Sequence, residues 1–209
     1  LVFPSLMTRV SPSVKYGLHY WLAIALFSLF VANSLAIVLI ALKVPALAIT
    51  SAQSLFKPFL AYHVNLAMVF WMPAVACWVW CYLFELPKKL IRVTLALSLI
   101  SLLLLLVSLS DVEQMVSLSN YYPILHSNVF IAALCLQILS VTIIASIVVT
   151  KPDQNVKKLF LAKAAAFAWL IFTLSIVLNI AFTNSMLVDT DYFEQLLWAP
   201  GHIQQIVNG

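Results

Sequence analysis

The sequence predicts an all-α protein, a polytopic helix bundle that crosses a lipid bilayer about six times. Hydrophobic residues make up 64% of the 209 residues and charged residues only 9%, which is too little polar surface to cover a soluble domain. The apolar stretches are long and continuous rather than short and alternating. They therefore predict transmembrane helices, which satisfy their own backbone hydrogen bonds, and not a β-barrel.

Six apolar stretches make up the predicted bundle, and they follow one another as a single membrane domain over residues 1–209. The predicted spans are 18–42, 59–84, 90–110, 122–150, 161–183 and 192–209. The sixth is cut off by the end of the chain. Because the chain opens on Leu1 rather than on methionine and stops inside an apolar run, we interpret it as a piece of something larger.

Basic residues are distributed unevenly between alternate loops, and this predicts the orientation. The segment before the first span and the loops after the second and fourth spans carry all but Lys43 and Lys57 of the 11 Lys and Arg residues. Such residues are retained on the cytoplasmic side of span ends. We therefore expect a cytoplasmic N-terminus in a multi-pass protein of the inner membrane, surrounded by lipid. The net charge of +4 follows from this topology and does not indicate nucleic-acid binding.

Two features inside the predicted spans have structural interpretations. Cys77 and Cys81 lie four residues apart on one helix face, a spacing that suits a soft-metal pair, but we favour packing as small apolar side chains. Pro73 removes a backbone hydrogen bond from the second span, so a kink is predicted there. The kink either makes room for a bulky cofactor or is an ordinary bend, and the sequence favours neither.

Histidines carry the functional prediction, because ionisable side chains inside a membrane are costly. His63, His126 and His202 each follow the outer start of a predicted span, and a rise of about 1.5 Å per residue places them roughly 7–15 Å below the outer boundary. Neutral imidazole binds haem iron and copper. The alternative is a histidine that hydrogen-bonds a neighbouring helix. His19, at the inner end of the first span, is interpreted as an interfacial residue.

The segment around His202 reads Trp198-Ala199-Pro200-Gly201-His202-Ile203-Gln204-Gln205. Gly201 permits a close backbone approach. Gln204 and Gln205 add polar groups and suggest a hydrated or liganded interior. Trp198 lies four residues before the histidine, on the same helix face, where its indole is placed to line a cofactor pocket.

These motifs resemble the N-terminal half of the catalytic subunit, subunit I, of haem-copper oxidases, and most closely the C-type oxidases and nitric oxide reductases. The matching segments are His63-Val64-Asn65-Leu66, then Met68, Phe70 and Pro73, and Trp198-Ala199-Pro200-Gly201-His202. They are similar to the family's second helix and to the opening of its sixth. The resemblance implies that His63 is an axial ligand of the low-spin haem. It also implies that His202 binds the copper or non-haem iron that faces a high-spin haem.

The sixth helix departs from part of the family pattern. Gln204 and Ile206 stand where the commonest oxidases carry a glutamate and a tyrosine, a pair that C-type oxidases also lack at this place. Nitric oxide reductases have a glutamate near the metal, for which Gln204 or Gln205 is at best a neutral replacement. The family's other metal and haem histidines lie on later helices, so other membrane subunits or a second chain are expected to complete the metal sites.

The resemblance implies an oxidoreductase of the respiratory chain. Electrons from a donor cytochrome would pass through haem to reduce dioxygen or nitric oxide. Two alternatives of other classes stay open. One is a transporter or channel with a polar path lined by His63, His126, Gln204 and Gln205. The other is a structural membrane subunit, including a degenerate relative that has lost the active site.

Overall fold

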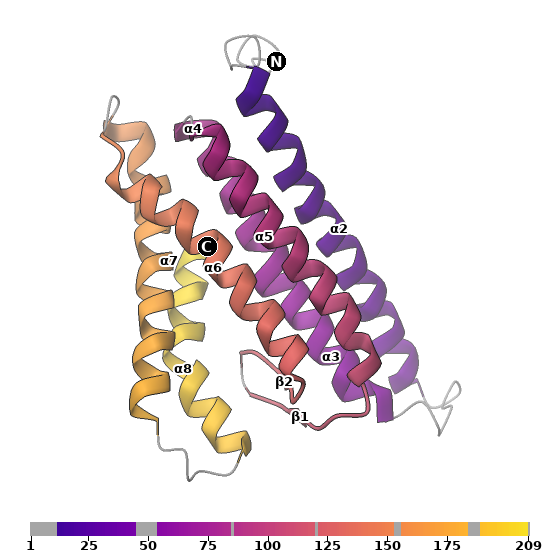
Figure 1. Cartoon of the computed structure of the whole chain (residues 1–209). Helices are drawn as coiled ribbons and strands as arrows, with labels where there is room; N and C mark the ends of the chain where they lie inside the picture. Colours follow the sequence, from indigo (N-terminus) through magenta and orange to yellow (C-terminus); the bar gives the residue numbers. More distant parts are fainter. Residues whose placement is uncertain are drawn as a thin grey trace.

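Long helices account for most of the described chain in the computed structural model (Figure 1), which describes residues 12–44, 54–84, 86–119, 121–152, 156–183 and 189–208. The elements are α2 (Pro12–Lys43), α3 (Phe56–Asn65), η3 (Leu66–Trp71), α4 (Met72–Phe84), α5 (Lys88–Val107), η4 (Ser108–Asp111), β1 (Val116–Ser117), β2 (Ile124–Leu125), α6 (Asn128–Thr150), α7 (Val156–Phe182) and α8 (Asp189–Asn208).

Five helices in the described part of the chain are long and apolar enough to cross a membrane. They are Leu18–Lys43, Phe56–Phe84, Lys88–Asp111, Asn128–Thr150 and Leu159–Phe182. These helices correspond to the first five predicted spans, which confirms the expectation of an α-helical, multi-pass membrane protein. The sixth predicted span corresponds to α8, which lies outside this set of five.

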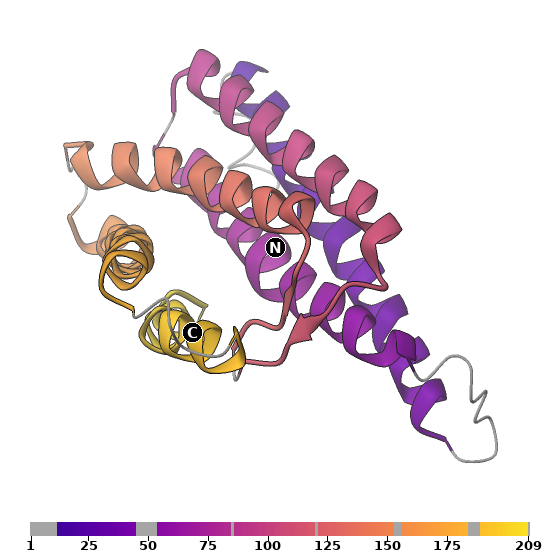
Figure 2. The same ribbon diagram turned by 60° about the horizontal axis from the view of Figure 1, so that its bottom comes forward.

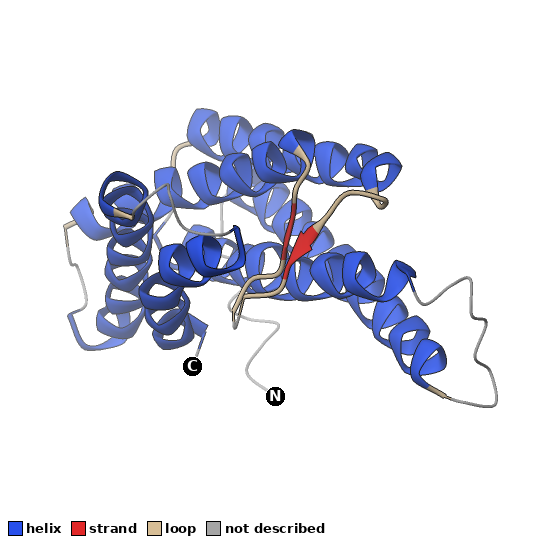
Figure 3. Cartoon of the chain, turned by 90° about the horizontal axis from the view of Figure 1, so that it is seen from below, coloured by secondary structure: helices blue, strands red, loops and turns tan. Residues whose placement is uncertain are grey.

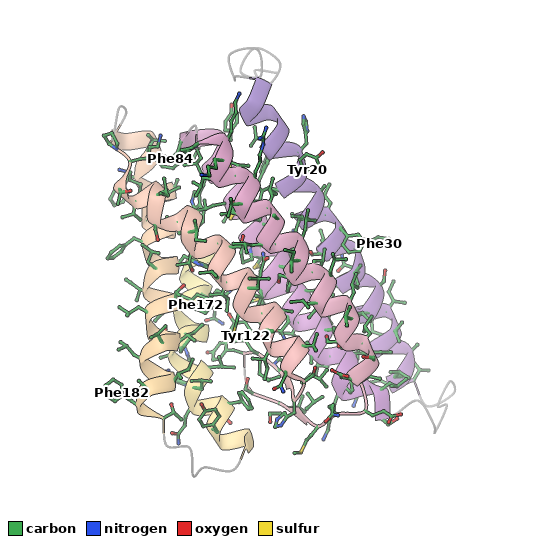
Figure 4. All side chains as sticks on the ribbon, viewed as in Figure 1. Tyr20, Phe30, Phe84, Tyr122, Phe172 and Phe182 are labelled. Carbon is green, nitrogen blue, oxygen red and sulfur yellow. The ribbon has the colours of Figure 1, made fainter. Side chains whose placement is uncertain are left out.

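The surface of the bundle is apolar where lipid would contact it. Figure 4 shows Phe30 on α2 and Phe182 on α7 pointing away from the other helices, whereas Phe172 and Tyr122 point inward. The exposed fractions agree, at 72% for Phe30 and 82% for Phe182 against 1% for Phe172. Apolar side chains this exposed on helices of this length are typical of a protein solvated by lipid.

The helices run side by side, and the chain reverses at each connection (Figure 1). The α3, η3 and α4 segments form one continuous helix against α2, α5 packs against α6, and α7 pairs with α8 (Figure 2). The short antiparallel hairpin of β1 and β2 lies where α3, α6 and α8 begin (Figure 3). We call this the hairpin end. The other end carries the basic residues that start α5, Lys88, Lys89 and Arg92.

The fourth membrane helix begins at Asn128, later than the predicted start near residue 122. Ser127 fixes this start because its side chain accepts a hydrogen bond from the Phe130 amide, at 3.3 Å. His126 therefore lies in the loop before the helix, and the prediction that the span includes it is wrong. The apolar residues that suggested a longer span, Ile124 and Leu125, are instead buried in β2 against the protein interior.

Polar side chains hold α5 and α6 together. The Ser98 hydroxyl donates to Gln137 Oε1 at 2.7 Å, and the Ser101 hydroxyl donates to the Ala133 carbonyl at 2.6 Å. All four residues are fully buried. In lipid, apolar side chains alone give little drive for helix association, so small residues and interhelical hydrogen bonds stabilise the pair.

Cys77 and Cys81 occupy the hydrophobic core. Both thiols are fully buried in a cluster that includes Trp21, Trp80 and Trp169. This placement agrees with the interpretation that the cysteines pack as small apolar side chains.

The second span adopts a π-helix, η3, immediately before the proline that predicted a kink. The Met72 amide donates to the Ala67 carbonyl, five residues back. In this register the next donor would be residue 73, paired with the Met68 carbonyl, but Pro73 has no N–H. The Met68 carbonyl instead accepts a hydrogen bond from Gln204 Nε2 at 2.6 Å. A side chain from α8 therefore completes the hydrogen bonding of the second span.

This compensation predicts coupling between Pro73 and Gln204. Gln204→Leu removes the donor to the Met68 carbonyl, whereas Pro73→Ala offers that carbonyl a backbone amide. We expect Gln204→Leu to cost about 1 kcal/mol more in the native chain than in the Pro73→Ala background. The measurement is a double-mutant cycle of unfolding free energies in detergent micelles.

The cycle also cancels any effect of the Gln204 substitution that does not depend on residue 73, such as the loss of the amide oxygen Oε1. Gln205→Leu is the matched control because Gln205 is the exposed neighbour, and it should show no coupling to residue 73. Equal costs of Gln204→Leu in the two backgrounds would contradict the compensation.

Candidate functional site

The predicted histidines contact different neighbours in the structure. His63 lies on α3 against α2, His126 lies in the hairpin, and His202 lies on α8 against the hairpin loop. Among the described residues, no group of three or more His, Cys, Asp or Glu side chains is arranged to hold a metal ion. The chain thus presents three separate histidine environments, which we consider in turn.

His63 is oriented by a backbone carbonyl of the neighbouring helix. Its Nδ1 lies 2.8 Å from the carbonyl oxygen of Ala32, and it is part-buried. A carbonyl oxygen only accepts, so Nδ1 carries the proton and the lone pair of the neutral ring is on Nε2. Histidines that bind metals commonly have their other ring nitrogen fixed in this way. His63 therefore has the tautomer that coordination through Nε2 requires.

An open cavity of about 540 Å³ lies beside His63, between α2 and α3. It is lined by Ala36, Leu39, Ile40, Lys43, Val44, Phe56, Leu60 and His63. The walls are apolar except at two places. His63 supplies one, and Lys43 supplies the other, with its Nζ 4.3 Å from the centroid of the Phe56 ring. This lining suits an apolar group that interacts with an imidazole at one point and carries negative charge at its edge.

His126 joins the parts of the hairpin. Its Nε2 lies 2.7 Å from the Ser117 hydroxyl on β1, and its amide donates to the Met115 carbonyl at 2.9 Å. The imidazole also contacts the edge of the Phe193 ring on α8, with centroids 5.5 Å apart. Through these contacts His126 positions the hairpin against α8.

His202 is exposed, and both of its ring nitrogens have partners. Nδ1 donates to the Trp198 carbonyl at 2.8 Å, and Nε2 accepts from the Tyr121 hydroxyl at 2.7 Å. The imidazole also lies against both aromatic rings, with centroids 4.4 Å from Trp198 and 4.7 Å from Tyr121. This arrangement does not fit a metal ligand, because the lone pair that would bind the metal already accepts a hydrogen bond. The prediction of a metal at His202 stays a prediction.

Gly201 makes the approach of Tyr121 possible. A Cβ built at position 201 would lie 2.3 Å from Cγ and 2.7 Å from Cβ of Tyr121, far inside van der Waals contact. The glycine before His202 therefore provides the space in which the Tyr121 ring packs on α8.

The sequence did not reveal that the hairpin loop, between β1 and β2, supplies hydrogen-bond partners to α8 and α3. Tyr121 contacts α8, and Asn65 on α3 donates to the Pro123 carbonyl at 2.8 Å and to the Ala61 carbonyl at 2.9 Å. A buried asparagine in an apolar span was the one available signal, since such an amide needs a polar partner.

Comparison with known proteins adds no relative. No protein family, characterised protein or solved structure matches the chain. The likeness to haem-copper oxidases therefore depends only on the residues described above.

The contact between Gly201 and Tyr121 predicts a large effect of one methyl group. Gly201→Ala should destabilise the fold by about 1–3 kcal/mol, because the new Cβ collides with the Tyr121 ring and displaces α8 or the loop. The measurement is the free energy of unfolding. Tyr121→Gly removes the three atoms nearest to the new Cβ, so Gly201→Ala should cost less in that background, and an undiminished cost there would refute the proposed contact.

Proposed function

We propose that the chain belongs to a membrane redox enzyme and that His63 binds haem iron through Nε2. The observation that carries the proposal is the hydrogen bond from His63 Nδ1 to the Ala32 carbonyl. It places a proton on Nδ1, and it restrains the rotation of the ring, as the second contact of metal-binding histidines commonly does.

The residues around the cavity fit a haem group. Apolar side chains of α2 and α3 would hold the macrocycle beside His63. Lys43 would attract the carboxylates that haem carries at one edge. Haem, when bound, supplies one-electron transfer, and the chain supplies the ligand, its orientation and an environment of low polarity.

The proposed topology has six spans, with α8 as the sixth, and a cytoplasmic N-terminus. It rests on the basic residues at the start of α5, just after α6 and in the first turns of α7, which lie at the end opposite the hairpin. Asp111 and Glu113 lie at the hairpin end, which is then the outer side. The site at His63 is nearer this outer side, where an electron-donor cytochrome would reach it.

The substrate in this proposal is dioxygen or nitric oxide, and other subunits or a second chain complete the metal sites. We derive no step through a metal at His202, because its Nε2 accepts from Tyr121. A polar transport path is the weaker alternative. It requires His63 and His126 to line one route, whereas the two imidazoles hydrogen-bond Ala32 on α2 and Ser117 on β1.

The proposal predicts that His63→Ala abolishes the low-spin haem component in the reduced-minus-oxidised visible spectrum. The sample is the complete complex, purified from its own membrane, because the proposal places the other ligands on other subunits or a second chain. The spectrum should lose this component because alanine offers no axial ligand, while expression and assembly are checked by the yield of the complex.

His126→Ala is the matched control, since that histidine binds Ser117 in the hairpin and not the cavity. It should leave the low-spin component in place. The proposal fails if the complete complex shows no haem absorbance, or if His63→Ala leaves the spectrum unchanged.

A further inference from the structure

The exposed face of α8 carries a stripe of polar and amphipathic side chains. Among the residues of α8 whose burial the structure describes, the exposed ones are Gln195, Trp198, His202 and Gln205. Their spacing of three, four and three residues places all of them on one face of the helix. We call this set the α8 stripe.

The inner part of the α8 stripe lies at the depth of the middle of the second span. Gln204 Nε2 donates to the Met68 carbonyl at 2.6 Å, and Met68 is near the middle of the 29-residue apolar helix Phe56–Phe84. His202 and Gln205 are within two residues of Gln204, which is about 3 Å along the helix axis. Where the second span crosses a membrane, these two exposed side chains therefore lie inside the hydrocarbon region.

Hydrocarbon is an unfavourable environment for the α8 stripe. The exposed faces of α2 and α7 carry large apolar side chains, such as Phe30 at 72% and Leu161 at 77% exposure. A glutamine amide in lipid would instead leave its donors and acceptor without partners, which is costly. The α8 stripe therefore requires a neighbour that offers polar groups within the membrane.

The charge at the start of α8 distinguishes between a second copy of this chain and a different polypeptide. The first two turns contain Asp189, Asp191 and Glu194, and the helix has no Lys or Arg. A two-fold axis along the membrane normal would place the acidic ends of two α8 helices beside each other, and like charges across an interface are unfavourable. A helix of another polypeptide can carry Lys or Arg at that level.

We propose that the α8 stripe binds a transmembrane helix of another polypeptide. This helix has a hydrogen-bonding side chain, from Ser, Thr, Asn or Gln, opposite Gln205, and Lys or Arg near the start of α8. The proposal rests on the proposed topology, in which α8 is the sixth span, but not on haem binding at His63. A complex without haem absorbance would therefore leave it standing.

The test is photocrosslinking in the native membrane with Gln205→benzoylphenylalanine in the full chain. Ile171→benzoylphenylalanine is the matched control, because Ile171 on α7 is apolar and 40% exposed. Asn179 on α7 contacts the Leu196 carbonyl on α8, and the two helices run in opposite directions from this contact, so residues 171 and 205 lie at similar depths.

We expect a product at position 205 whose partner peptide, identified by mass spectrometry, belongs to a transmembrane span with the stated side chains. Position 171 should give no such product. A crosslink only to a second copy of the chain, only to lipid or to no protein would overturn the proposal, and so would the same product at both positions. Trp198→benzoylphenylalanine exchanges one aromatic side chain of the stripe for another and provides the same test if the first variant does not accumulate.

Gln205→Leu gives a second measurement without a bulky probe. Leucine removes the proposed interhelical hydrogen bond, so about threefold less of the crosslinked polypeptide should copurify with the chain in mild detergent. Ile171→Leu should leave the copurified amount unchanged. Because Gln205 is exposed, the unfolding temperature of the isolated chain should not decrease in Gln205→Leu. Undiminished copurification in Gln205→Leu would count against the α8 stripe as the contact surface.

Discussion

The arrangement of this protein depends on the requirement that backbone groups inside a lipid bilayer find partners within the protein. Pro73 breaks the regular pattern of the second span because it has no N–H, and the π-register before it leaves the Met68 carbonyl for another donor. Gln204 on α8 is that donor. The missing amide therefore links the second span to α8, which packs mainly on α7 and contributes Leu197 to the wall of a small cavity that Asn65 also lines.

The same requirement explains why the three histidines differ in chemical availability. His202 and His126 contact hydroxyl groups of the hairpin loop through Nε2, so that nitrogen contributes to packing this loop against the helices. His63 instead bonds a carbonyl of the neighbouring helix through Nδ1, and the residue lines the open cavity between α2 and α3. The distinction depends on whether Nε2 has a hydroxyl partner, as it does in His126 and His202, and depth in the membrane alone does not provide it.

Hydropathy predicted the helices well, because length and apolar composition decide whether a segment can cross a bilayer. It placed the fourth span too early, since Ile124 and Leu125 are apolar for burial in protein and not in lipid, and composition does not separate these two environments. The missing backbone hydrogen bond at Pro73 was predictable, whereas the π-register before it and the donor from α8 were not. The hydrogen bond between His202 and Tyr121 could not be predicted either, because Tyr121 lies 81 residues away and no local pattern pairs the two residues.

His63 and Asn65 lie two residues apart, and this spacing explains why they have different neighbours. Residues two apart in a helix point about 200° apart around its axis, so the two side chains face nearly opposite directions from one turn of α3. His63 faces α2 and the large cavity, while Asn65 faces the hairpin loop and the small one. Asn65 therefore anchors α3 to the hairpin loop on one side, and the His63 imidazole bonds α2 on the other. A His-x-Asn pair in this setting joins one helix to two different neighbours.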